Sequence, residues 1–441
     1  MLIIILLVSC GASKKPSETI VSETASNKPT DNKPKTLQEV LQKEAAKPDS
    51  IPKNLTDSSF NKKLFTYKDR YEIAILLPFY LHSIDGDTAK SPFIDPESKL
   101  GIEFYKGVIM AIDSLQAQGL KARFHVFDSQ NNEDTVKSLL TAGKLENMDL
   151  VIGPIFNTQA RLVADYCKKK NITMVSPLSP TDNITSKNAN FIMANPRLDV
   201  HCEQLLEFAF DSMPNSNYVV VYQDNPIESK YAAMFDKLVG TYNMGHPSKQ
   251  LKITKAIIKG KGLSADLSPY MSSSKPNIII IPSVDLPFLV NIGRELYTLV
   301  NKYDLTVMGM PIWGTDENLR LDYSNAFKLH FTSPYYVRPE FFEKDNALRS
   351  AFIDRFGNEP SENALKAYDL VNYFGKLIIH YGINYRDMML VDYSSAWSTA
   401  YKFRKNMVMD ATGKEAVEYI ENKHVNILKY EDFQLELVNH R

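Results

Sequence analysis

The chain has 441 residues, of which 44% are hydrophobic and 23% are charged. This balance is typical of a globular protein, and the length exceeds what one hydrophobic core usually supports, so we expect two lobes. The formal net charge of -1 provides no global field that would favour nucleic acid as a partner.

The first ten residues, MLIIILLVSC, predict a bacterial export signal. Their apolar run is far shorter than the roughly 20 residues of a membrane-spanning helix, and it fits the apolar region of a signal peptide. The alternative is a buried strand with a chance cysteine. "LVSC" resembles the lipobox of bacterial lipoproteins, which implies that residues 1–10 are a lipoprotein signal ending in Cys10. The resemblance implies that Cys10 is lipidated and anchors the protein to the membrane, most simply on the periplasmic side of the cell envelope.

Residues 11–70 are rich in Ser, Thr, Lys, Asn and Pro. Such a segment buries too little apolar surface to offset the entropy of ordering, so we expect a disordered linker. The pattern of apolar and polar residues changes at Tyr71. From there, apolar strands alternate with amphipathic helices, without hairpin signals. Strands are expected at 71–79, 121–129, 149–155, 172–177 and 191–195, and helices at 99–119, 133–145 and 157–170.

The same alternation restarts after residue 195, which predicts a second unit of the same kind. Its expected strands are 217–224, 252–258, 276–283 and 305–310, and its helices are 199–210, 230–242 and 286–300. Two long helices at 339–357 and 361–382 and a hairpin at 425–438 complete the chain. The fold class is therefore α/β, with two doubly wound lobes, each a parallel sheet covered by helices on both faces.

Two loops in the first lobe, GPIFNT (153–158) and SPLSPT (176–181), each follow a predicted strand. Ligands of open parallel sheets bind at the carboxyl ends of the strands. The first loop opens a helix, whose first amides attract anions, and the second supplies hydroxyl groups. Together they predict a cup for a small polar or anionic group such as a carboxylate. The alternative is that these side chains only cap helices or stabilise turns.

Several stretches stand in the order used by type I periplasmic solute-binding proteins, and the chain resembles that family from Tyr71 to its C-terminus. They are IAILLPF, GIEFYKGVIMAID, LVIGPIFNTQA, ITMVSPLSPTDN, KPNIIIIPS and FIDRFGNEPSENALKAYDLV. The family includes branched-chain amino-acid-binding proteins and receptor ligand-binding domains. The resemblance implies three crossovers between the lobes, near Asn195, Ser333 and Tyr385. The first lobe would be 71–194 plus 334–385, and the second 195–333 plus 386–441.

The resemblance also implies a ligand site between the lobes, closed by their movement. In amino-acid-binding members, the loops that match GPIFNT and SPLSPT hold the α-carboxylate and the ammonium group. Asp224 or Asp285 would be a partner for an ammonium group, and Trp313 an apolar wall. The implied ligand-binding residues are Asn157, Thr158, Ser176, Ser179 and Thr181 in the first lobe, and Tyr222, Asp224, Ser283 and Asp285 in the second.

Two departures from the family pattern leave two functions open. The loop DNPIESK after VVVYQD lacks the aromatic-glycine pair of amino-acid binders, and the loop at 80–99 is long. The first function is a lipid-anchored solute-binding protein that passes an amino acid or short peptide to an ABC permease or a sensor. The second is an interaction protein of the same fold, similar to activators of peptidoglycan synthases (penicillin-binding proteins).

Catalytic and metal-binding patterns are weak in this sequence. No HExxH, GxSxG or CxxC motif occurs, and Cys167 and Cys202 fit buried free thiols. GKGLSA (260–265) matches the dinucleotide pattern GxGxxA, but a match of two glycines arises easily by chance, so a nucleotide-dependent enzyme is the least favoured alternative. We therefore expect a protein that is not an enzyme and has no cofactor or metal.

Overall fold

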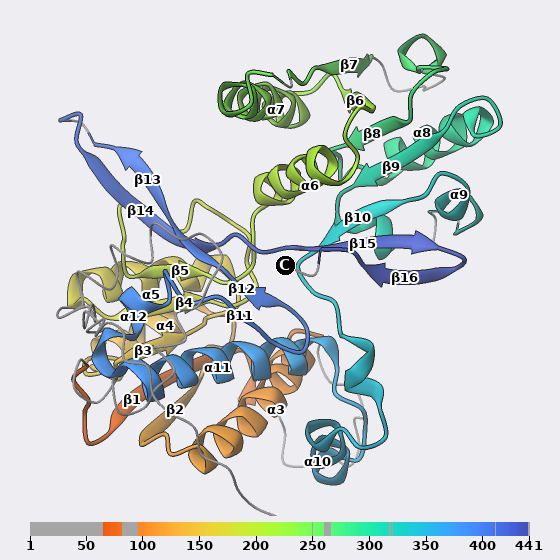
Figure 1. Cartoon of the computed structure of the whole chain (residues 1–441). Helices are drawn as coiled ribbons and strands as arrows, with labels where there is room; N and C mark the ends of the chain where they lie inside the picture. Colours follow the sequence, from red (N-terminus) through yellow and green to blue (C-terminus); the bar gives the residue numbers. More distant parts are fainter. Residues whose placement is uncertain are drawn as a thin grey trace, which may run out of the picture.

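Figure 1 shows the computed structural model of the chain as two lobes, each built on one large β-sheet. The structure describes residues 65–81, 96–248, 250–259, 266–316, 319, 321–410 and 412–439. The expected signal peptide with Cys10, the linker as far as residue 64 and the GKGLSA loop lie outside the described residues.

The first lobe has a seven-stranded sheet in the order β13-β14-β5-β4-β3-β1-β2, in which β1 to β5 are parallel. Alternate residues of β1 point to opposite faces, because side chains alternate along a strand. Ile73 and Ile75 pack against α3 and α11, whereas Ala74 and Leu76 pack against α4 and α5. The elements are β1 (Tyr71–Leu77), α3 (Pro96–Ala117), β2 (Ala122–Asp128), α4 (Glu133–Thr141), β3 (Leu150–Ile152), α5 (Asn157–Lys170), β4 (Thr173–Ser176), β5 (Phe191–Met193) and α11 (Glu362–Tyr381).

The second lobe repeats this arrangement in a sheet of order β16-β15-β10-β9-β8-β6-β7. Helices α6 and α7 cover one face, and α8 and α9 cover the other. The parallel sheets and two-sided cover confirm the predicted fold class. The elements are α6 (Leu198–Ser212), β6 (Asn217–Gln223), α7 (Pro226–Gly245), β7 (Ile253–Ile258), η4 (Ser268–Tyr270), β8 (Asn277–Ile281), α8 (Leu286–Leu299), β9 (Leu305–Gly309), η5 (Pro311–Gly314), α9 (Leu321–Ala326), β10 (His330–Ser333), β15 (Asn426–Glu431) and β16 (Gln434–Leu437).

The C-terminal quarter differs from the expected lobe boundaries. Residues 386–441 were expected in the second lobe, but β14 (Glu415–Asn422) pairs in parallel with β5, and β13 (Phe403–Met409) pairs antiparallel with β14. Phe403 and Ile420 are buried in the core of the first lobe. The third crossover therefore lies at 423–425, between β14 and β15, and not near Tyr385. The remaining elements of this region are η7 (Gly382–Asn384), α12 (Tyr385–Met388), β11 (Ser394–Ser395) and β12 (Ala400–Tyr401).

Two further boundaries also differ. The folded region begins before Tyr71, because Phe65 is buried against the ring of Tyr381 and the Ile383 amide donates to the Thr66 carbonyl at 2.9 Å. The helix expected at 339–357 is two pieces, η6 (Pro339–Phe342) and α10 (Ala347–Phe356). Asn346 caps α10 by accepting from the Arg349 amide, so the chain restarts there.

Candidate functional site

The two polar loops of the first lobe meet at the carboxyl edge of its sheet. The Asn157 side-chain amide donates to the Thr181 hydroxyl at 3.1 Å. Gly153 permits the approach of the first loop, since its φ is +90° and a Cβ there would lie 2.3 Å from the Leu76 carbonyl oxygen. Asn157 and Thr158 are exposed. The loops thus form one continuous polar edge facing away from the sheet.

Helix α5 begins at this edge without a side-chain cap. Its N-cap is Phe156, whose side chain has no oxygen to accept from the first amides of the helix. Orphan amides at a helix start attract an anionic acceptor. Near this edge in the sequence, the Ser176 hydroxyl and the side-chain oxygen of Gln159 are buried without a hydrogen-bond partner in the described part of the chain. Ser179 accepts from the Thr181 amide at 3.2 Å, so it also stabilises the turn.

The matching residues of the second lobe are mostly engaged within that lobe. Tyr222 is buried in the core between the sheet and helices α6 and α7. Asp285 caps α8 by accepting from the Phe288 amide at 2.9 Å. The buried Ser283 hydroxyl donates to Glu228 Oε1 at 2.6 Å. Of the four candidates in this lobe, Asp224 alone has an exposed side chain with no hydrogen bond or ion pair to another described residue. Tyr222, Ser283 and Asp285 therefore each have a structural role within the second lobe, and their ligand roles stay predictions.

Glu228 is the buried polar residue that the sequence analysis missed in this lobe. Its second oxygen, Oε2, accepts from the Gln223 amide at 2.6 Å, so the carboxylate ties the end of β6 to the loop after β8. Asn225 caps α7 by accepting from the Ile227 and Glu228 amides. A capping residue followed three positions later by Glu is a recognisable helix-start pattern, and it was the available signal.

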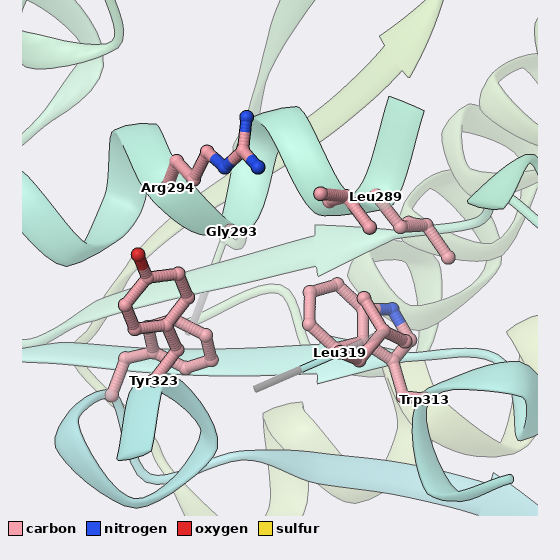
Figure 2. A pocket seen from close by; sticks show the side chains of 8 residues that line it. Leu289, Gly293, Arg294, Trp313, Leu319 and Tyr323 are labelled. Atoms are coloured by element: carbon pink, nitrogen blue, oxygen red, sulfur yellow. The ribbon is translucent and has the colours of Figure 1, made fainter. Parts of the chain in front are cut away.

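Trp313 also lies away from the expected position. Its ring packs over Gly309, where an added Cβ would come within 2.1 Å of the indole. Figure 2 shows it with Leu289, Gly293 and Tyr323 around a small cavity between α8 and the following segments. Trp313 is therefore part of the α8 side of the second lobe's core, and not a wall between the lobes.

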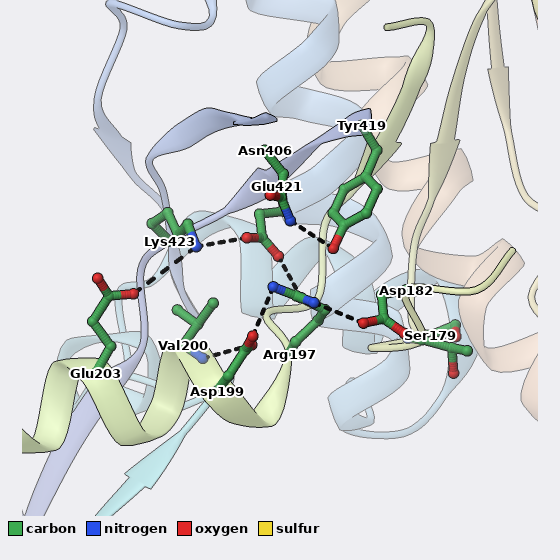
Figure 3. Close-up of polar contacts among 11 residues, drawn as sticks. Ser179, Asp182, Arg197, Asp199, Val200, Glu203, Asn406, Tyr419, Glu421 and Lys423 are labelled. Atoms are coloured by element: carbon green, nitrogen blue, oxygen red, sulfur yellow. Dashed lines mark hydrogen bonds and ion pairs between the residues drawn. The ribbon is translucent and has the colours of Figure 1, made fainter. Parts of the chain in front are cut away.

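A charged cluster centred on Arg197 joins the first and third crossovers (Figure 3). Arg197 Nε lies 2.9 Å from Glu421 of β14, and its two terminal nitrogens lie 2.8 Å from Asp182 and 2.7 Å from Asp199. Its guanidinium carbon lies 5.6 Å from the centroid of the Tyr419 ring. Burial opposes the charge of Arg197, but Glu421 and Asp199 outweigh it and raise its pKa.

Lys423 completes this cluster from the third crossover. Its ammonium lies 2.6 Å from the other oxygen of the fully buried Glu421 and 3.9 Å from Glu203 of α6. Asp182 directly follows the second polar loop and Asp199 lies in the first turn of α6, so the cluster links the polar edge of one lobe to a helix of the other. Glu421 is 224 positions from Arg197 in the sequence, so no local sequence pattern predicts that pairing.

Buried ionisable groups are divided unevenly between the lobes. Burial lowers the pKa of His201 to about 3 and those of His330 and His424 to about 4, so all three are neutral at pH 7. In the first lobe, burial raises the pKa of Asp369 to about 6, while hydrogen bonds from Ser398 and Trp397 and the charge of Arg338 act in the opposite direction. The described residues contain no group of three or more His, Cys, Asp or Glu placed to hold a metal ion.

A larger cavity lies where the second and third crossovers meet the C-terminal hairpin. We call it the interlobe cavity. Its volume is about 510 Å³, and it is lined by residues from 336–340, 393–400, 424–426 and 435–439. None of the nine predicted ligand-binding residues is among the described residues that line it. It is therefore separate from the edge formed by Asn157 and Thr181.

Comparison with known proteins agrees with this architecture. A family model described as periplasmic binding protein matches residues 96–387, more than half of the chain. A comparison with curated protein sequences found no match. Within the described residues, every helix is too short or too polar to span a bilayer.

Three solved structures illustrate the fold. A putative branched-chain amino acid ABC transporter protein from Rhodospirillum rubrum is 12% identical over 84% of this chain and 100% of its own, with a TM-score of 0.55. A branched-chain amino acid ABC transporter periplasmic ligand-binding protein from Burkholderia xenovorans is 12% identical over 83% of this chain and 94% of its own, with a TM-score of 0.50. LpoA from Haemophilus influenzae is 13% identical over 91% of this chain but only 65% of its own, with a TM-score of 0.51.

Proposed function

Because the chain belongs to the periplasmic binding protein family, we propose that it is a non-enzymatic binding protein of the bacterial envelope. It holds a small polar ligand, an amino acid or a short peptide, at the edge of the first lobe and encloses it with the second. The observation that carries this proposal is the contact between Asn157 and Thr181, which joins two strand-end loops beside the uncapped start of α5.

The chemistry of that edge favours a carboxylate. The first amides of α5 and the Asn157 and Thr181 side chains are hydrogen-bond donors at one place, and a carboxylate accepts several such bonds at once. Asp224, exposed after β6 in the opposite lobe, supplies a negative charge for an ammonium group. The two ends of an amino acid would then be held by different lobes, which couples binding to closure.

A titration of the purified protein tests this function. A panel of amino acids and di- and tripeptides should contain a ligand that raises the melting temperature, since binding to the folded state alone stabilises it. The double change Ser179→Ala with Thr181→Ala should abolish that shift. Asp285→Asn, which keeps the helix cap, is the matched control and should leave the shift unchanged. A panel without any stabilising ligand would contradict the proposal.

The lipid anchor is a separate part of the proposal and rests on LVSC at the N-terminus. Cys10→Ala should move the protein from the membrane fraction of the producing bacterium to the soluble fraction. A protein that remains with the membranes after this change would show that something other than Cys10 holds it there.

The interaction role is a second candidate, and one observation favours it. In the second lobe, Tyr222, Ser283 and Asp285 are engaged in core packing, a buried hydrogen bond and a helix cap, which leaves few groups there to recognise a small ligand. Pull-down of the anchored protein from solubilised envelope distinguishes the two roles. Recovery of an ABC permease supports the solute-binding role, and recovery of a peptidoglycan synthase supports the interaction role.

A further inference from the structure

We propose that the interlobe cavity is a second ligand site, which takes a small zwitterion such as a free amino acid, with its carboxylate directed at Arg338 and Asn426. This site is independent of the edge at Asn157 and Thr181, and it can exist whether or not that edge binds a ligand.

The cavity has the size and the construction of a binding site. Its volume of about 510 Å³ falls within the range of roughly 300–1,000 Å³ that is usual for small-molecule pockets. Main-chain hydrogen bonds fix its walls: the amides of Tyr336 and Arg338 donate to the carbonyls of Ser398 and Trp397 at 2.8 and 3.1 Å. Its walls come from both lobes, so a ligand there contacts the crossovers about which the lobes would move.

Asn426 is the residue that points to a ligand. It begins β15, lines the cavity and is only 4% exposed. Its Oδ1 lies 3.4 Å from His424 Nε2, whereas its Nδ2 has no hydrogen-bond partner in the described part of the chain. Turning the amide over would leave the oxygen without a partner instead. An unpaired buried amide costs about 1–3 kcal/mol, and an acceptor on a ligand would satisfy it.

Arg338 supplies the positive charge in the same cavity. Its side chain is half-buried, and within the described residues it makes no salt bridge or side-chain hydrogen bond. His424 adds no second charge, since burial lowers its pKa to about 4. One guanidinium beside one unpaired amide suits a single carboxylate, because the guanidinium fork matches the two carboxylate oxygens.

The outer lining carries the opposite charge. Glu340 and Glu436 line the cavity and are both exposed, while Asn426 and His424 are buried. Two exposed carboxylates would repel phosphate and other multiply charged anions and attract an ammonium group. The positive charge lies deeper in the cavity and the negative charges lie at its exposed lining. This arrangement complements the carboxylate and the ammonium group of a zwitterion.

Calorimetric titration of the full chain in detergent tests the site. The probes are the twenty amino acids and dialanine, with acetate and methylamine as separated halves of a zwitterion. We expect at least one amino acid to bind, and acetate and methylamine to bind at least about tenfold more weakly. Arg338→Gln and Asn426→Ala should each weaken the amino acid about 10- to 100-fold, the effect of losing one charge-assisted hydrogen bond.

Two controls separate this site from a structural role and from the proposed function. Asn426→Ala should change the melting temperature little, because it removes an Nδ2 that is unpaired within the described residues and only one long contact, from Oδ1 to His424 Nε2 at 3.4 Å. Asn157→Ala should weaken binding at the first-lobe edge only, so the component of the titration that Arg338→Gln removes should keep its affinity in Asn157→Ala. If affinity is instead lost in Asn157→Ala and kept in Arg338→Gln, the ligand belongs to the first-lobe edge, and the second site is overturned while the proposed function stands.

The remaining outcomes also decide the matter. If no probe binds, or if Arg338→Gln destabilises the protein without changing the affinity, the cavity is not a zwitterion site. If both cavity variants fail to fold, Glu340→Gln provides the test, since this residue is exposed. It should reduce the preference for the amino acid over acetate about tenfold, and an unchanged preference would overturn the proposal.

Discussion

The two lobes share one order of five parallel strands but use the residues at their strand ends in different ways. In the first lobe, α5 starts at Phe156 without a side-chain cap, and the loop residues Asn157 and Thr181 bind each other. In the second lobe, Asn225 and Asp285 cap α7 and α8, and Ser283 binds the buried Glu228. A polar residue at a strand end is therefore a ligand candidate only where the next helix does not use it as a cap.

The largest effect should come from removing the buried carboxylate of the second lobe. Glu228→Ala leaves the Gln223 amide and the Ser283 hydroxyl without their acceptor, and hydrogen bonds to a charged group contribute roughly 1.5–3 kcal/mol each. We expect the free energy of unfolding to fall by about 4 kcal/mol in urea denaturation. Glu228→Gln, which keeps one acceptor, should lose less. Equal losses in the two variants would mean that Glu228 stabilises the lobe through the packing of its side chain and not by accepting hydrogen bonds.

Acidification should weaken the second lobe more than the first. His201 and His330 of the second lobe, and His424 of the third crossover, have folded-state pKa values of about 3 to 4, below the ordinary value of 6.5. Their contribution to the free energy of unfolding is complete above pH 6.5 and is lost as the pH falls towards 4. Between these pH values the histidines of the unfolded chain bind protons, whereas those of the folded chain stay neutral. Between pH 7 and 5.5 we expect a loss of about 1 kcal/mol for each histidine.

Asp369 of the first lobe works in the opposite direction. Its pKa is raised to about 6, so its contribution is complete below pH 3.8 and is lost as the pH rises through 6. Asp369→Asn should therefore steepen the loss of stability on acidification. Hydrogen-exchange protection factors at pH 5.5 and 7, which correct for the pH dependence of intrinsic exchange, locate the effect, and protection should fall first in β6 to β10. An equal loss of protection in both lobes would contradict the assignment to the three histidines.

The caps provide a smaller and sharper test of the comparison. Asp285→Ala removes the side-chain cap of α8 and should cost about 1 kcal/mol of unfolding free energy, measured by chemical denaturation. Asp285→Asn should restore most of it, since an amide oxygen accepts the same bond. If Asp285→Ala abolishes ligand binding without changing stability, then Asp285 is a ligand residue after all.

The smallest effect on stability is expected at the first-lobe edge. Asn157→Ala loses one exposed hydrogen bond and no helix cap, so we expect a change below about 0.5 kcal/mol. The same change should weaken a ligand held at that edge about tenfold, measured by calorimetric titration. A variant that is clearly destabilised would show that the contact with Thr181 serves the fold and not a ligand.

Much of this molecule could be predicted from local patterns in the sequence. Apolar runs such as 71–77 and 277–281 identify strands, since strands covered on both faces are apolar throughout. The alternation with amphipathic helices predicts parallel sheets, and the hairpin at β15 and β16 was visible in its turn. The meeting of the GPIFNT and SPLSPT loops followed from the rule that parallel strands end at one edge.

Other features required the tertiary structure, because they depend on contacts between distant segments. The hairpin of β13 and β14 joins β5 across more than 200 residues, and nothing local distinguishes that partner from the second sheet. Arg197 finds Glu421 in the same way, and the unpaired amide of Asn426 appears only once its surroundings are assembled. Local patterns were enough to identify the strands and helices, because backbone preference and hydrophobic period are local. Which polar groups the fold uses, and which remain for a ligand, depended on the assembled structure, because hydrogen-bond satisfaction is a property of the packed chain.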